Sequence, residues 1–135
     1  MASPDPLIAF VVPGAPATKG SFVSFVHRGR VVTKSDTATL KSWTRDVQIC
    51  AIAAGVTLIP KGTGVVVGVE FQFTRPARAR RMTPCIRPDC DKLARALLDA
   101  LTGIAYADDG QVIGLSIAKM YGGTTETRVA VEAIS

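Results

Sequence analysis

Two pairs of aspartates mark the stretch "RPDCDKLARALLDALTGIAYADDGQV", residues 87–112. Asp89 and Asp91 stand one residue apart after a proline, and Asp108 and Asp109 are adjacent. Carboxylate oxygens are hard ligands, and Mg²⁺ usually takes one or two protein carboxylates together with water and substrate phosphate oxygens. The two pairs therefore predict a divalent-metal site that acts on phosphate esters.

A helix must lie between the two pairs. Apolar residues at helical spacing predict it from about Cys90 to Leu101, and Gly103 closes it. The first pair then lies at a loop-to-helix junction, where an extended or turn-like backbone aims both carboxylates toward one point. The second pair follows the helix and precedes a strand. If the helix packs on a sheet, we expect the returning chain to bring the second pair back beside the first.

Each pair also has a structural explanation. Aspartates are common caps at helix N-termini, and Asp-Asp-Gly is an ordinary turn sequence. Asp91 and Arg95 have the spacing of an i,i+4 ion pair, and Asp99 lies well inside the helix. Spacing alone therefore leaves the catalytic and the structural interpretations open.

A run of arginines precedes the first aspartate pair. Carboxylates repel a phosphodiester unless metal ions bridge them, whereas arginines hold neighbouring phosphates, so the combination suits metal-dependent cleavage of nucleic acid. A solvated basic loop is the alternative interpretation. The candidate DNA contacts are Arg75, Arg78, Arg80, Arg81 and Arg87 in this loop, with Lys19 and Arg28 in the N-terminal loops.

The rest of the pattern predicts an α/β layout. Residues 111–121 and 127–134, separated by "GGTTE", are interpreted as two closing strands of an antiparallel hairpin. The other expected elements are a buried strand at 7–12, a hairpin or irregular pair of strands around 28–30, a helix between 35 and 55, and a half-buried strand at 64–75.

Composition sets the outer limits. The length of 135 residues predicts one domain over residues 1–135. The formal charge of +5 predicts an anionic partner. Its three cysteines are odd in number and show no CxxC spacing, which favours a reduced, cytoplasmic protein with free thiols. The N-terminus does not resemble a secretory signal, and no apolar run reaches the roughly 18 residues of a membrane span. No membrane partner is expected.

The aspartate pattern resembles the signature of the RusA family of Holliday-junction resolvases: PD-x-D-N-L, then a helix with D-A-L, then D-D-x-Q-V. The resemblance implies an α+β domain with a mixed β-sheet packed against two main helices. It also implies a homodimeric endonuclease that makes paired symmetric nicks in four-way DNA junctions during recombination and repair. The resemblance further implies one or two Mg²⁺ ions per site, replaceable by Mn²⁺, and no nucleotide cofactor. It also implies a phage origin, with action in the host cytoplasm.

The resemblance assigns roles residue by residue. Catalytic, metal-binding aspartates fall on Asp89, Asp91 and Asp109, with Asp108 as an adjacent ligand. The family's essential lysine falls on Arg95, which keeps the positive charge but presents a planar fork and does not deprotonate. Lys92 stands where the pattern often has asparagine, and it is a second candidate for an ammonium near the scissile phosphate.

A non-catalytic module that binds branched DNA is the alternative from another class. It uses the basic loop for phosphates and the aspartates as caps and turns, so Asp89→Asn and Asp91→Asn would leave its function intact. Two further classes of DxD protein fit less well. Dehalogenase-like phosphatases carry DxD directly after an apolar strand, whereas "TPCIRP" intervenes here. Sugar transferases that carry DxD usually have a much longer chain.

Overall fold

Strands and helices alternate along the chain. The structure is a computed structural model that describes residues 7–18, 22–35 and 37–135. Within these residues the order is β1 (Ile8–Pro13), β2 (Phe22–His27), β3 (Arg30–Ser35), α1 (Thr37–Ala53), β4 (Gly64–Thr74), α2 (Cys90–Leu101), the 3₁₀ helix η1 (Asp109–Gln111), β5 (Val112–Gly122) and β6 (Glu126–Ile134).

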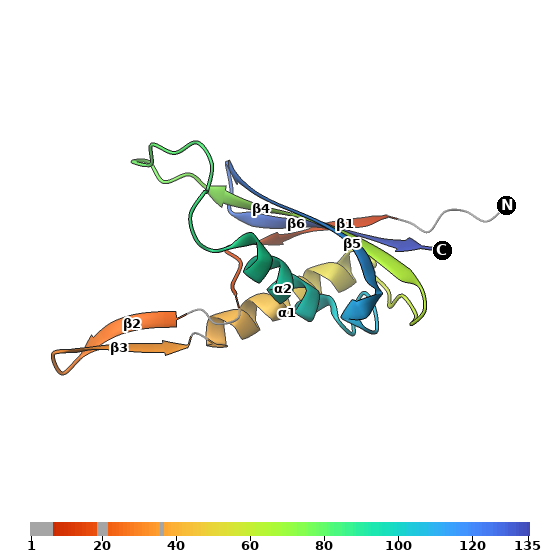
Figure 1. Ribbon diagram of the computed structural model, residues 1–135, viewed down its shortest axis with the longest axis horizontal. Coiled ribbons are helices and arrows are strands. Elements are labelled where there is room, and N and C mark those ends of the chain that lie inside the picture. Colours follow the sequence, from red (N-terminus) through yellow and green to blue (C-terminus); the bar gives the residue numbers. More distant parts are fainter. Residues whose placement is uncertain (1–6, 19–21, 36) are drawn as a thin grey trace.

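Four strands form the main sheet in the order β1-β6-β4-β5. β4 and β5 are parallel, whereas the β1–β6 and β4–β6 pairs are antiparallel, so the sheet is mixed. Both α-helices lie on one face of this sheet, and β2 and β3 form a separate hairpin that extends away from it (Figure 1). The predicted α+β architecture of a mixed sheet and two main helices is confirmed.

Alternation along β4 explains how the core is built. Val65, Val67 and Phe71 are fully buried, whereas Glu70 on the opposite face is exposed. The leucines of α2 recur at helical spacing, and three of them are also fully buried in the same core. Apolar residues of period two on the strand thus meet apolar residues of period 3.6 on the helix. The buried leucines are Leu93, Leu97 and Leu101.

The expected hairpin of the last two strands is wrong. Both strands form, but β4 lies between them, parallel to β5 and antiparallel to β6. A parallel pair needs a crossover connection, and α2 provides it by carrying the chain from β4 to β5. β5 therefore takes one side of β4, and β6 takes the side that remains free. The side chains of β4 are mostly apolar, which suits a central strand.

The hairpin predicted around residues 28–30 is confirmed. β2 and β3 pair antiparallel and are joined by Arg28 and Gly29, which have φ angles of 49° and 76°. Two consecutive positive φ angles are typical of the tight turns that join antiparallel strands. Arg28 is exposed at this turn, and Lys19 lies outside the described residues. No helix in the described part of the chain is long and apolar enough to cross a membrane.

Candidate active site

Asp89 and Asp91 lie at the N-terminal end of α2. Asp89 is the N-cap residue, with φ −75° and ψ 143°, but its side chain makes no capping hydrogen bond. Asp91 lies in the first turn, and both residues are exposed. No ion pair joins Asp91 to Arg95 within the described residues. The side-chain cap by Asp89 and the ion pair of Asp91 with Arg95 are therefore not formed.

Two basic side chains flank this acidic pair. The Lys92 Nζ lies 4.0 Å from the Asp89 Oδ2, and the two side chains are 61% and 50% exposed. An exposed pair at this distance contributes about 0–1 kcal/mol, so Lys92 is easily displaced by a ligand. Arg95 is exposed one turn further along α2. Both cations can approach a phosphate held at Asp89 and Asp91.

The arginines of the 75–88 loop divide into two groups, and the first group holds the loop together. The Arg75 Nε donates to the carbonyl oxygen of Arg81 at 3.0 Å, and its guanidinium also donates to the carbonyl of Ala79. The Arg81 Nε donates to the hydroxyl of Tyr121 on β5 at 2.7 Å. These two predicted DNA contacts thus have donors committed to the loop and the sheet.

The second group is free. Arg78, Arg80 and Arg87 are exposed and form no hydrogen bond or ion pair with the residues that the structure describes. In Figure 1 the loop that carries them and the β2–β3 hairpin both extend toward the left of the view, the loop above and the hairpin below the start of α2. Exposed arginines therefore stand in the loop that leads to Asp89.

The second aspartate pair lies beyond the other end of α2. The Asp108 Oδ1 accepts from the Gly110 backbone N–H at 2.9 Å as the N-cap of η1, and this bond lowers the pKa of the Asp108 carboxyl. Asp109 is exposed near the buried Tyr106. Burial raises the pKa of Tyr106 above its usual range, and the charges of Asp109 and Asp99 raise it further. Asp108 is thus a structural cap, whereas Asp109 is available as a ligand.

Gln111, the glutamine of the D-D-x-Q-V pattern, fixes this turn and was not predicted as a site residue. Its Oε1 accepts from the backbone N–H groups of Ala107 and Asp108, each at 2.9 Å. Its Nε2 carries two hydrogens and donates to the carbonyl oxygens of Pro60 at 2.9 Å and Thr63 at 3.0 Å, with the carbonyl oxygen of Ile59 further away at 3.3 Å. The side chain is buried, so one amide bonds four backbone groups and contacts a fifth. A polar residue directly before an apolar strand was the available sequence signal.

The two acidic pairs do not meet within one chain. α2 has 12 residues and is therefore about 18 Å long, with Asp89 at its start and Asp109 beyond its end. No group of three Asp, Glu, His or Cys side chains that could hold a metal ion occurs in the described ranges. The prediction that the second pair returns beside the first is therefore wrong for a single chain. A crossover helix runs opposite to the strands that it connects, so the chain re-enters the sheet at the end far from Asp89 and Asp91.

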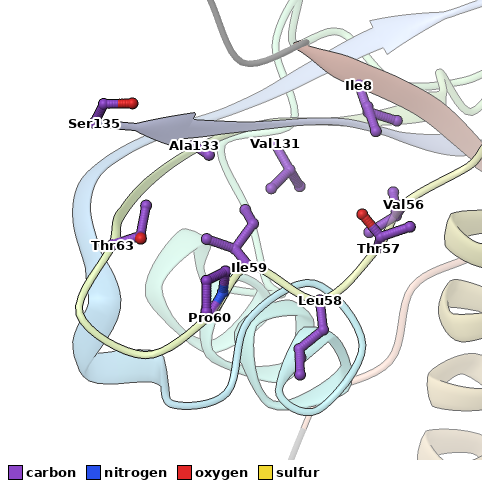
Figure 2. Close-up of a pocket in the computed structure, with 10 residues that line it drawn as sticks. All are labelled: Ile8, Val56, Thr57, Leu58, Ile59, Pro60, Thr63, Val131, Ala133 and Ser135. Carbon is purple, nitrogen blue, oxygen red and sulfur yellow. The ribbon is translucent and has the colours of Figure 1, made fainter.

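An apolar groove of about 410 Å³ lies elsewhere, between the 56–63 segment and strands β1 and β6 (Figure 2). No charged side chain lines it, so it offers no site for a phosphate. The residues around it are Ile8, Val56, Thr57, Leu58, Ile59, Pro60, Thr63, Val131, Ala133 and Ser135.

Comparison with known families shows to which family the chain belongs. The model of the family described as endodeoxyribonuclease RusA matches residues 13–132. The chain belongs to the RusA family. Family membership makes it a nuclease that resolves Holliday junctions. The chain is also 25% identical over 142 residues to the uncharacterized protein YqaN of Bacillus subtilis (strain 168), and the match covers 95% of this chain and 97% of that protein.

Replacing Gln111 should destabilise this RusA-family chain strongly. Gln111→Met keeps the length of the side chain but removes its bonds to the 107–108 backbone N–H groups and to the carbonyls of the 59–63 segment, of which that of Pro60 still accepts from the Thr63 N–H. A buried unsatisfied group costs about 1–3 kcal/mol, so the free energy of unfolding should fall by about 3 kcal/mol in urea titrations. Gln48→Met is the matched control, since Gln48 donates one hydrogen bond, to Ala100, and should cost about 1 kcal/mol or less. Equal losses would contradict the assignment.

Asp108 should make stability depend on pH. The bond from Gly110 lowers the pKa of the Asp108 carboxyl in the folded state. The ionised carboxyl therefore stabilises the folded state fully at pH values above its unfolded pKa, and this stabilisation is lost as the pH falls through the folded pKa. Asp108→Asn keeps an acceptor oxygen without the charge. We expect the wild type to be more stable than the variant at pH 7 and the difference to vanish on acidification, as measured by urea unfolding between pH 7 and pH 2. A difference independent of pH would exclude this role.

Proposed function

We propose that this RusA-family nuclease cuts four-way DNA junctions with a divalent cation held by Asp89, Asp91 and Asp109, and that it does so as a homodimer. The observation that carries the proposal is the exposure of Asp89 and Asp91, whose one ion pair among the described residues is the weak contact of Asp89 with Lys92. Both carboxylates are exposed and unused for capping or ion pairing with Arg95, and unpaired arginines lie beside them. A helix that needed Asp89 only as a cap would have its carboxylate bonded to the backbone.

The donor chemistry fits Mg²⁺, with Mn²⁺ as a substitute. The candidate ligands are carboxylates without sulfur or imidazole among them, and Mg²⁺ prefers one or two such oxygens while keeping several waters. When bound, a divalent cation activates water as the nucleophile and offsets charge on the phosphate oxygens. Asp108 is a secondary candidate, since its exposed carboxylate is adjacent to Asp109 but already accepts from the backbone of η1.

The basic residues supply binding and charge stabilisation. Arg78, Arg80 and Arg87 are exposed in the loop that leads to Asp89, and they would hold the phosphates that flank the cut. Arg95 and Lys92 project from the first two turns of α2, where they would stabilise the charge that develops on the cleaved phosphate. Arg95 acts here as a fixed positive charge, since a guanidinium does not give up its proton.

The separation of the acidic pairs gives a physical reason for dimerisation. Asp89 and Asp91 lie at one end of α2 and Asp109 beyond the other, so one chain does not assemble all three. Two chains related by a two-fold axis, with their α2 helices antiparallel, would bring the first pair of each chain to Asp109 of the other. A four-way junction has near two-fold symmetry, and such a dimer presents it with two equivalent sites.

Neutralising the proposed ligands should abolish cutting but preserve DNA binding. Asp89→Asn, Asp91→Asn and Asp109→Asn each remove a ligand charge, and the first two also reduce repulsion of the phosphates. On an end-labelled synthetic four-way junction with Mg²⁺, we expect paired nicks from the wild type and at least about 100-fold slower cutting from each variant. Band-shift affinity should be equal or higher. Asp46→Asn, an exposed change on α1, is the control. Normal cutting by the Asp91 variant would overturn the assignment.

A mixture of two inactive variants tests whether one site draws on two chains. In a dimer of one Asp91→Asn chain and one Asp109→Asn chain, shared sites would leave one site with both changes and the other intact. Refolding the two variants together should then restore single nicks in the junction. If each site belongs to one chain, every site keeps one defect and the mixture stays inactive. That result would exclude the shared site.

A further inference from the structure

The segment immediately before Asp89 is held by a lysine on a distant strand. The Lys119 Nζ donates to the carbonyl oxygen of Ile86 at 2.7 Å and to that of Pro88 at 2.8 Å. An ammonium has three donors, so two of them are committed to the backbone on either side of Arg87. Hydrogen bonds from a charged donor are shorter and stronger than neutral ones, and these distances are typical of them.

The base of this lysine is anchored in the sheet. Lys119 lies on β5 opposite Phe71 of β4, and Phe71 is fully buried. Above the sheet, a pocket of about 160 Å³ lies between β5 and the loop, and its lining includes Lys119, Ile86 and Pro88. The lysine therefore extends from a rigid strand to the backbone of an otherwise exposed loop.

The contact continues directly into α2. Pro88, whose carbonyl accepts from Lys119, precedes Asp89, and the Asp89 carbonyl accepts from the Leu93 N–H at 3.0 Å. Leu93 is fully buried in the core. The backbone of Asp89 is thus held from one side by the lysine and from the other by the buried helix. Its carboxylate, which makes no capping bond, is the part left free.

We infer that Lys119 is a positioning residue for the Asp89–Asp91 site: its ammonium holds the Ile86–Pro88 backbone against β5 so that both carboxylates face one cation. The inference rests on the proposed function. The role inferred for Lys119 differs from those proposed for Lys92 and Arg95, which are exposed on α2 and can reach a phosphate directly. Lys119 acts through the backbone and its effect should appear even without DNA.

Two substitutions separate this role from general stabilisation. Lys119→Met keeps the apolar stem but removes the donors, and Lys119→Arg restores a cation with several donors. Lys41→Met, an exposed change on α1, is the control. The measurements on the full chain are amide hydrogen exchange by mass spectrometry, Mn²⁺ binding by electron paramagnetic resonance, and the cutting rate on the four-way junction.

In Lys119→Met, we expect faster exchange confined to residues 86–93, several-fold weaker Mn²⁺ binding and slower cutting with nearly unchanged junction affinity. The cutting rate should fall by about ten-fold or more, since a 1 Å displacement of a catalytic group can cost about 100-fold. Lys119→Arg should recover part of the exchange protection and of the Mn²⁺ affinity.

Wild-type exchange and Mn²⁺ binding in Lys119→Met would overturn the inference. So would faster exchange spread evenly over the chain, because that pattern indicates a general stabiliser. If Lys119→Met does not fold, Lys119→Arg decides: faster exchange limited to residues 86–93 together with weaker Mn²⁺ binding supports the inference, and any other pattern overturns it. Failure of the wild type to cut junctions would refute the proposed function alone, because the exchange measurement does not depend on cutting.

Discussion

Burial of one face of α2 against the sheet determines where the acidic side chains lie. Leu93, Leu97 and Leu101 are fully buried, so the rotation and the direction of the helix are set by the core. With the helix in this direction, Asp89 and Asp91 lie at one end of the sheet and Asp109 at the other. The helix cannot shorten this separation without exposing leucines to water, which disfavours bringing the three carboxylates together within one chain. In the proposed dimer, a second chain would supply the missing carboxylate.

The segments before and after α2 are each held by a polar side chain that binds backbone. Gln111 joins the aspartate turn to the 59–63 segment, and Lys119 joins the loop before Asp89 to β5. Loops that carry functional residues are exposed, so few apolar contacts hold them in place. Hydrogen bonds from residues seated on the sheet replace those contacts. The same principle divides the arginines, since Arg75 and Arg81 maintain the loop while its other arginines remain free for an anionic ligand.

Local patterns predicted the elements well because their causes are local. The period-two run of β4, the helical spacing of α2 and the tight turn at Arg28 and Gly29 all formed as expected. Pairing of the last two strands was mispredicted because strand partners depend on residues far apart in the chain. β6 pairs with both β1 and β4, and its short connection to β5 does not reveal either choice. The roles of Gln111 and Lys119 were missed for the same reason.

The sequence by itself determined the family and, with it, the nuclease activity. Spaced carboxylates, a basic loop and the D-D-x-Q-V ending depend on residue types and short spacings, which are readable without coordinates. Only the tertiary structure decided which of these residues are free to act. It made Asp108 the N-cap of η1, left the Asp89 carboxylate without a capping hydrogen bond, and separated the aspartate pairs by the length of α2. The physical reason is that folding decides which partners compete for a side chain, through the local turn at Asp108 and through the core packing of α2 that keeps the two pairs apart.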